Sequence, residues 1–199
     1  MASDERNFTH STLRERIVEH VFIGDVLRTL WQHGVTDVEI LRPEFDAHGY
    51  DVVMSRGSVV RHVQLKTQAA GKVSVGRALA EKPCGCVIWI GLNKTTLELG
   101  PFLWFGGLPG EALPDISTYP HAVRPTHNAK GERPVRKNFH VVPPRAFTKL
   151  ETLDALILKL FGTLPSAPDT VDGNAVDREL EQRHALPIQT RNSEVSQSV

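Results

Sequence analysis

The chain has 199 residues, of which 40% are hydrophobic and 23% are charged, and its 23 Lys and Arg balance its 23 Asp and Glu. This composition is typical of a globular protein of one domain with an appendage, and it excludes a disordered or fibrous chain. There is no apolar stretch at the N-terminus and no apolar run of about 18 residues, so we expect a cytoplasmic protein that does not bind a membrane.

The first half of the chain predicts a helix followed by three strands. Thr12 and Glu15 match a capping box, and apolar residues recur at helical spacing through about residue 32. A first strand is expected over 35–41. Two Val-rich segments, 49–54 and 59–67, are separated by a short polar stretch with a glycine and predict a β-hairpin.

The second half predicts fewer regular elements. Residues 78–82 are expected to form a short helix, and the continuous apolar run 85–92 predicts a central strand buried on both faces. One or two strands are expected over 95–105. The segment 106–144 shows little periodicity apart from a short strand at 138–142. A second capping box at Thr148 then predicts a helix that ends at Gly162.

This order of elements predicts an α/β (α+β) fold, in which a small mixed β-sheet is flanked by helices. The predicted domain covers residues 1–162. Residues 163–199 are rich in Ser, Pro and Asp, then in Glu, Gln and Arg, and contain few large apolar side chains. We therefore expect them to form a flexible C-terminal tail.

The hairpin carries the residues that point to chemistry. Side chains two apart in a strand share a face, so Gln64 and Lys66 point to the same side, and the hairpin brings Asp51 close to Gln64. Mg²⁺ takes oxygen ligands and keeps several waters, so the Asp51 carboxylate, the Gln64 side-chain oxygen and the Leu65 carbonyl are enough for a site. A neighbouring lysine can orient a water or stabilise charge on a phosphate. The same residues also allow a simpler interpretation, an ion pair between Asp51 and Lys66.

An Asp followed by Asp/Glu/Gln-x-Lys on the next strand, after a helix that carries a Glu, resembles the PD-(D/E)xK nuclease superfamily, which includes the restriction endonucleases. The matching residues are Asp51, Gln64 and Lys66, with Glu19 as the helix acid, and the resemblance covers residues 12–95. Tyr50 precedes Asp51 where the family pattern has Pro. Gln64 replaces the usual acid, so the chain is similar to a Gln-x-Lys variant of this family.

The resemblance implies a restriction-endonuclease-like core and Mg²⁺-dependent hydrolysis of DNA phosphodiester bonds, with Mn²⁺ able to substitute. Asp51 would be the main metal ligand, and Gln64 and Glu19 would be further ligands. Lys66 would position the attacking water. Glu15, one helical turn before Glu19, is the alternative helix acid. The family's habits imply an endonuclease that works as a homodimer or in a larger complex, in defence, repair or a mobile element.

Five residues are candidate contacts to a nucleic-acid backbone. Thr67 and Gln68 follow the lysine of the motif, and Arg133, Arg136 and Lys137 belong to a basic stretch between residues 124 and 145 that contains a single acid. A solvated loop is the alternative interpretation of this stretch. DNA is the expected partner, and the residues leave RNA open. The alternative function is an inactive nuclease-fold module that binds nucleic acid or a protein partner.

Overall fold

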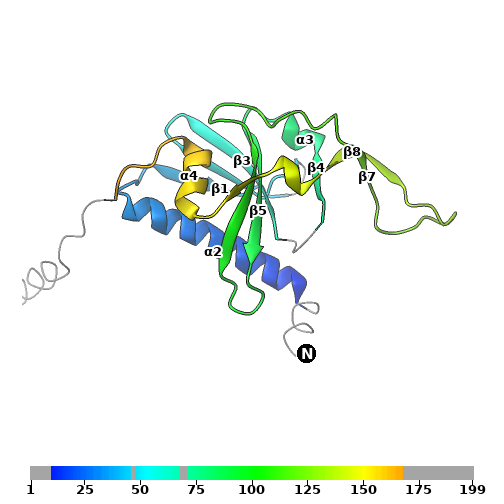
Figure 1. Cartoon of the computed structure of the whole chain (residues 1–199), viewed down its shortest axis with the longest axis horizontal. Helices are drawn as coiled ribbons and strands as arrows, with labels where there is room; N and C mark the ends of the chain where they lie inside the picture. The colour runs from blue at the N-terminus through cyan, green and yellow to red at the C-terminus, as the bar shows by residue number, and fades with distance from the viewer. Residues whose placement is uncertain (1–9, 46–47, 68–70, 168–199) are drawn as a thin grey trace, which may run out of the picture. The chain divides into compact units, whose positions relative to one another are not determined.

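The main sheet of the protein has six strands and carries the predicted hairpin near its middle (Figure 1). The computed structural model describes residues 10–45, 48–67 and 71–167. The strand order is β1-β2-β3-β5-β6-β9, with β3 and β5 parallel and every other neighbouring pair antiparallel. The strands are β1 (Val38–Leu41), β2 (Val52–Arg56), β3 (Val59–Lys66), β5 (Gly85–Leu92), β6 (Leu99–Gly106) and β9 (Thr148–Leu150).

Two helices pack on one face of this sheet, α2 (Ser11–Gln32) and α4 (Leu153–Phe161). The buried stripe of α2 repeats every four residues, which places it on one side of the helix against the sheet. The helix α4 begins after Thr152, whose hydroxyl accepts a hydrogen bond from the Ala155 N–H at 3.2 Å, and ends at Gly162 with φ of 78°. Within the described ranges, no helix has the length and apolar character needed to cross a membrane.

A second sheet packs on the other face. It has three antiparallel strands in the order β4-β8-β7, formed by β4 (Val73–Gly76), β8 (Val135–Val142) and β7 (His121–Val123). The short helix α3 (Arg77–Ala80) follows β4, and the 3₁₀ turn η1 (Pro144–Ala146) follows β8. Apolar side chains of β4, α3 and β8 form a cluster with alternate residues of β5. The predicted mixed sheet flanked by helices is therefore confirmed, as is the burial of β5 on both faces.

Three local expectations were wrong. The helix α2 begins at Ser11 without a side-chain cap, so the Thr12 capping box does not form. Thr148 starts the edge strand β9, which pairs with β6, and the cap of α4 is Thr152 instead. The segment 106–144 contributes two strands of the second sheet, of which only the end of β8 was expected.

Arg61 of β3 is completely buried and ties the sheet to the end of α4. Its guanidinium donates hydrogen bonds to the carbonyl oxygens of Leu160 at 2.8 Å, Lys159 at 2.9 Å and Gly107 at 3.1 Å. The last carbonyls of a helix have no partner within the helix, so Arg61 supplies a donor to two of them, one buried and one partly buried. Burial lowers the pKa of the Arg61 side chain from its usual value, and the three acceptors offset that cost.

Replacing Arg61 with Met should therefore destabilise the protein strongly. The change leaves one buried and two partly buried carbonyls without a donor, and each unsatisfied buried group costs about 1–3 kcal/mol, so we expect the free energy of unfolding to fall by about 3 kcal/mol or more in urea titrations. Arg28→Met on the exposed face of α2 removes only a surface ion pair with Asp25 and should cost less than about 1 kcal/mol. Equal losses in the two variants would contradict the role assigned to Arg61.

Candidate functional site

The hairpin places Asp51 beside the end of β3, in the same cleft as Gln64. Val52 pairs with Val63, and the Asp51 N–H also donates to the Val63 carbonyl, at 2.9 Å, so two residues face one where β2 begins. Gly49, with φ of 72°, turns the chain into this position in a conformation that side-chain-bearing residues rarely adopt. The hydrogen bond to Val63 therefore fixes Asp51 at the edge of β3, and Asp51 and Gln64 line one cleft.

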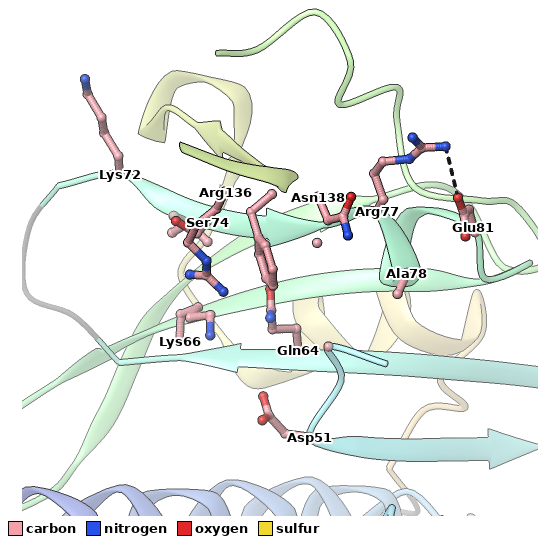
Figure 2. A pocket seen from close by; sticks show the side chains of 14 residues that line it. Asp51, Gln64, Lys66, Lys72, Ser74, Arg77, Ala78, Glu81, Arg136 and Asn138 are labelled. Atoms are coloured by element: carbon pink, nitrogen blue, oxygen red, sulfur yellow. Dashed lines mark hydrogen bonds and ion pairs between the residues drawn. The ribbon is translucent and has the colours of Figure 1, made fainter. Parts of the chain in front are cut away.

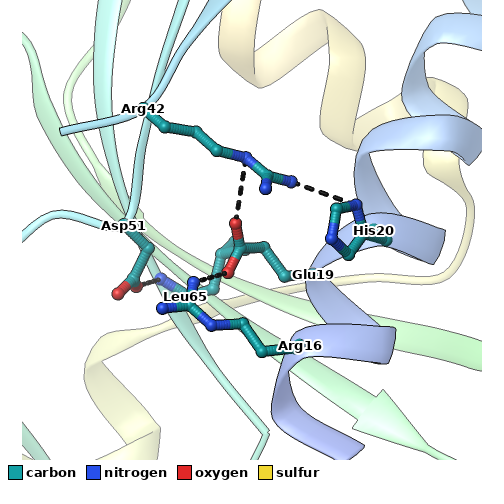
Figure 3. A network of polar contacts seen from close by, with 6 residues as sticks. All are labelled: Arg16, Glu19, His20, Arg42, Asp51 and Leu65. Atoms are coloured by element: carbon teal, nitrogen blue, oxygen red, sulfur yellow. Dashed lines mark hydrogen bonds and ion pairs between the residues drawn. The ribbon is translucent and has the colours of Figure 1, made fainter. Parts of the chain in front are cut away.

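The carboxylate of Asp51 is held against the edge of β3. Its Oδ2 accepts a hydrogen bond of 2.6 Å from the Leu65 N–H (Figure 3). Leu65 was expected to contribute its carbonyl to a metal site, and that role stays a prediction. What the structure adds is that the amide of the same residue fixes the orientation of the carboxylate.

Gln64 has a buried oxygen that lacks a hydrogen-bond partner. This atom is the side-chain Oε1, and the residue as a whole is only 6% exposed. It lines a cleft of about 800 Å³ together with Asp51 and Lys66 (Figure 2). A buried acceptor without a donor costs about 1–3 kcal/mol, so this oxygen is suited to a cation or a donor that enters the cleft.

The opposite wall of this cleft comes from the second sheet and α3, as Figure 2 shows. Four basic and two acidic side chains line the cleft as a whole. One of the basic groups, Arg77, forms an ion pair with Glu81 at 3.3 Å. The cleft therefore carries a net positive charge and favours an anion such as a phosphate. The charged lining residues are Asp51, Lys66, Lys72, Arg77, Glu81 and Arg136, and Ser74 and Asn138 add polar groups.

A smaller cleft of about 370 Å³ lies between β3 and the N-terminal half of α2. Asp51, Lys66 and Thr67 line it from the hairpin, and Glu15 and Glu19 line it from the helix. Both candidate helix acids thus share a cleft with the Asp51 carboxylate. Asp51 and Lys66 line both clefts, so they lie at the junction between them.

Glu19 already has two cationic neighbours. Its carboxylate forms ion pairs with Arg16 at 3.1 Å and with Arg42 at 3.3 Å, and its side chain is 11% exposed (Figure 3). A metal ion bound by Glu19 would have to displace one of these guanidinium groups or share the carboxylate with them. Glu15, one turn earlier, is exposed at the same cleft. The structure therefore keeps both helix acids as candidates.

The five predicted contacts to nucleic acid are not all together. Arg136 lines the main cleft and stacks over the ring of Phe139 with 3.6 Å between the guanidinium carbon and the ring centroid. Lys137, next in β8, points into a neighbouring pocket, and Arg133 lies in the exposed connection before the strand. Thr67 lines the small cleft, and Gln68 lies outside the described residues.

Sequence reasoning missed the residues that close the main cleft, which are Lys72, Ser74, Arg77 and Asn138. They come from β4, the residue before it, α3 and β8, and the pairing of β4 with β8 brings them together. No local pattern signals that pairing.

His62 lies on the Gln64 face of β3. Burial is the main cause that lowers the pKa of His62, and the positive charge of Lys82 and the nearby His48 lower it further. Its ring contacts the edge of Tyr50 with 4.9 Å between centroids. His62 therefore supports the segment that leads into Asp51.

The donor set fits a magnesium ion that keeps most of its waters. Among the described residues, no group of three or more His, Cys, Asp and Glu side chains could hold a metal ion by itself. A hydrated Mg²⁺ does not need such a group, because one or two carboxylates and further oxygen atoms are sufficient. Asp51 and the unpartnered Gln64 oxygen supply these atoms.

Comparison with family models, with curated proteins and with solved structures found no match to this chain. What the site does therefore has to be inferred from its own residues.

If the Gln64 amide serves a ligand and not the fold, Gln64→Met should cost no stability. Met has a similar size and removes the unpaired oxygen, so we expect the free energy of unfolding to stay unchanged or rise by about 1 kcal/mol in metal-free buffer. The exposed Gln32→Met on α2 is the control for the chemical change itself. A loss of about 1–3 kcal/mol for Gln64→Met alone would show that the amide makes a structural hydrogen bond.

Proposed function

We propose that the chain is a Mg²⁺-dependent nuclease that hydrolyses DNA phosphodiester bonds at the junction of the two clefts. The observation that carries this proposal is the buried, unpartnered Gln64 oxygen, which shares a cleft of net positive charge with Asp51 and Lys66. A cation-binding pair of oxygens next to an anion-binding wall is the combination that phosphodiester hydrolysis requires.

The order of elements supports a restriction-endonuclease-like core for this proposal. The helix α2 is followed by the antiparallel strands β1, β2 and β3, and the chain then crosses over to β5, parallel to β3. The acid precedes β2, and Gln64 and Lys66 lie at the end of β3. This is the order in which the PD-(D/E)xK pattern places its residues.

Each residue at the junction then has a defined task. Mg²⁺ would be held by Asp51 and Gln64, with Glu19 or Glu15 reaching it from α2, and would supply Lewis-acid stabilisation and a more acidic bound water. The hydrogen bond from the Leu65 N–H keeps the Asp51 carboxylate oriented. The Lys66 ammonium orients the attacking water and stabilises the charge that grows on the phosphate.

Arg136 and Lys72 would hold the substrate in the main cleft. Both line the wall opposite Gln64, where their charges can neutralise phosphates next to the one that reacts. Arg133 and Lys137, outside this wall, extend the positive surface along β8 and the connection that precedes it. Such contacts position a backbone and carry no base specificity.

The second candidate function is a nuclease-fold module without activity. It is favoured by Gln64 itself, since a neutral amide binds Mg²⁺ more weakly than a carboxylate does, and by the two arginines that already neutralise Glu19. Such a module would still bind nucleic acid through the basic wall.

A cleavage assay separates the two candidates. Plasmid DNA, single-stranded DNA and RNA are incubated with Mg²⁺ or Mn²⁺, and we expect Asp51→Asn and Lys66→Met to lower the cleavage rate by about 100-fold or more. Gln64→Glu should keep or increase activity, because it restores a carboxylate ligand. The controls are Asp37→Asn and Lys94→Met, which make the same chemical changes at exposed positions.

The absence of cleavage would decide against the enzyme. If the wild type cleaves none of these substrates with either metal, and Gln64→Glu is inert as well, the chain is a binding module.

Arg136→Ala should weaken DNA binding without regard to sequence. In EDTA, where no cleavage occurs, we expect about a tenfold loss of affinity at low salt and a reduction of about 1 in the slope of log K against log salt concentration, measured by fluorescence anisotropy. Arg28→Ala on α2 is the matched control and should leave both values unchanged. An unaltered salt slope for Arg136→Ala would mean that Arg136 makes no phosphate contact.

A further inference from the structure

The helix α2 carries two apolar stripes where its own fold needs only one. The first is buried against the sheet and contains Val18, Phe22, Val26 and Leu30. The second consists of large apolar side chains that remain exposed, at 59% for Leu13, 37% for Ile17, 38% for Leu27 and 72% for Trp31. We call this second set the outer stripe.

The outer stripe is continuous along the helix. The exposed residues His20 and Gly24 lie between its apolar members. Together, the six residues are spaced alternately four and three positions apart in the sequence. This spacing places them on one line along an α-helix, on the side opposite the buried stripe. Single exposed apolar residues are common, but a row of them on one helix marks a contact surface.

The outer stripe is complementary to itself when a second copy runs in the opposite direction. With a two-fold axis at the level of Phe22, Leu13 faces Trp31 of the second copy, Ile17 faces Leu27, and His20 faces Gly24. A small residue thus meets a larger one at the centre. Space at Gly24 is open, because a Cβ added there would meet no atom within 4 Å.

The charges beside the outer stripe do not oppose this pairing. The same axis brings Arg16 near Arg28 of the second copy, but each guanidinium is already paired with an acid of its own helix. Arg16 contacts Glu19 at 3.1 Å, and Arg28 contacts Asp25 at 2.8 Å. Repulsion between the two arginines is therefore largely neutralised.

We propose that the outer stripe of α2 is a self-association surface that pairs antiparallel with α2 of a second copy. This proposal is independent of the nuclease function. An isologous contact of this kind closes a dimer with two-fold symmetry. Because one helix of about 33 Å forms the contact, the interface lies at the small end of specific interfaces, and we expect a dissociation constant of about 1–100 µM.

Sedimentation velocity of the full chain at about 1–500 µM protein tests the proposal, because these concentrations span the expected dissociation constant. The wild type should shift from monomer to dimer with rising concentration, and Leu27→Glu should remain a monomer throughout. Leu108→Glu introduces the same change at an apolar residue that is 61% exposed in the loop after β6, and it should dimerise like the wild type. Circular dichroism confirms that each variant is folded. A wild type that stays monomeric at the highest concentration, or equal losses in both variants, overturns the proposal.

Cysteine cross-linking tests the direction of the two helices. The variants Ile17→Cys and Leu27→Cys are mixed and oxidised, and the antiparallel arrangement predicts a disulfide dimer that joins one chain of each kind. Either variant alone should give no more dimer than the wild type, which carries its own Cys84 and Cys86. Strong cross-linking of Ile17→Cys to itself would indicate a parallel pair and overturn the proposed arrangement.

Discussion

The fold depends on a guanidinium group inside the core. Arg61 joins the middle of the main sheet to the last turn of α4 by hydrogen bonds to main-chain carbonyls, and its guanidinium carbon lies 5.4 Å from the centroid of the Trp104 ring. The helix C-terminus carries partial negative charge, so these carbonyls are good acceptors for a cation. Because Arg61 fixes β3 from the face covered by helices, the Gln64 and Lys66 side chains on its other face are also held in place.

That other face becomes a site only because a second sheet packs over it. The apolar cluster between β4, α3, β8 and β5 holds the two sheets together beside the hairpin. The hairpin contributes an acid, an amide and a lysine, and the second sheet contributes much of the positive wall. The chemistry that we propose therefore depends on two layers that are distant in sequence, with Asp51 at the point where the main cleft meets the smaller one under α2.

The sequence predicted what depends on local patterns. Strand alternation and turn residues gave the hairpin, continuous apolar character gave β5, and Gly162 marked the end of α4. The Thr148 capping box misled because hydrogen bonding to β6 competes with helix formation there, and the helix starts after Thr152. The second sheet could not be predicted, since its strands β4 and β8 pair residues that are distant in the sequence, such as Val73 with Val142. The same distance hid Lys72 and Asn138 from any prediction of the site. The missing partner of the Gln64 oxygen is likewise a property of packing that no sequence motif encodes.

The alternation along β3 also limits how this protein can change during evolution. Arg61, Val63 and Leu65 serve the helix-covered face, while Gln64 and Lys66 serve the cleft, all within eight consecutive residues. Inserting or deleting one residue in this strand would exchange the two sets of side chains, so the core and the site would be lost together. The connection between β7 and β8 has no alternation of buried and exposed side chains to preserve, so an odd change in its length does not exchange two faces. Changes in length are therefore tolerated between β7 and β8, and they are disruptive in the strand that carries the proposed site.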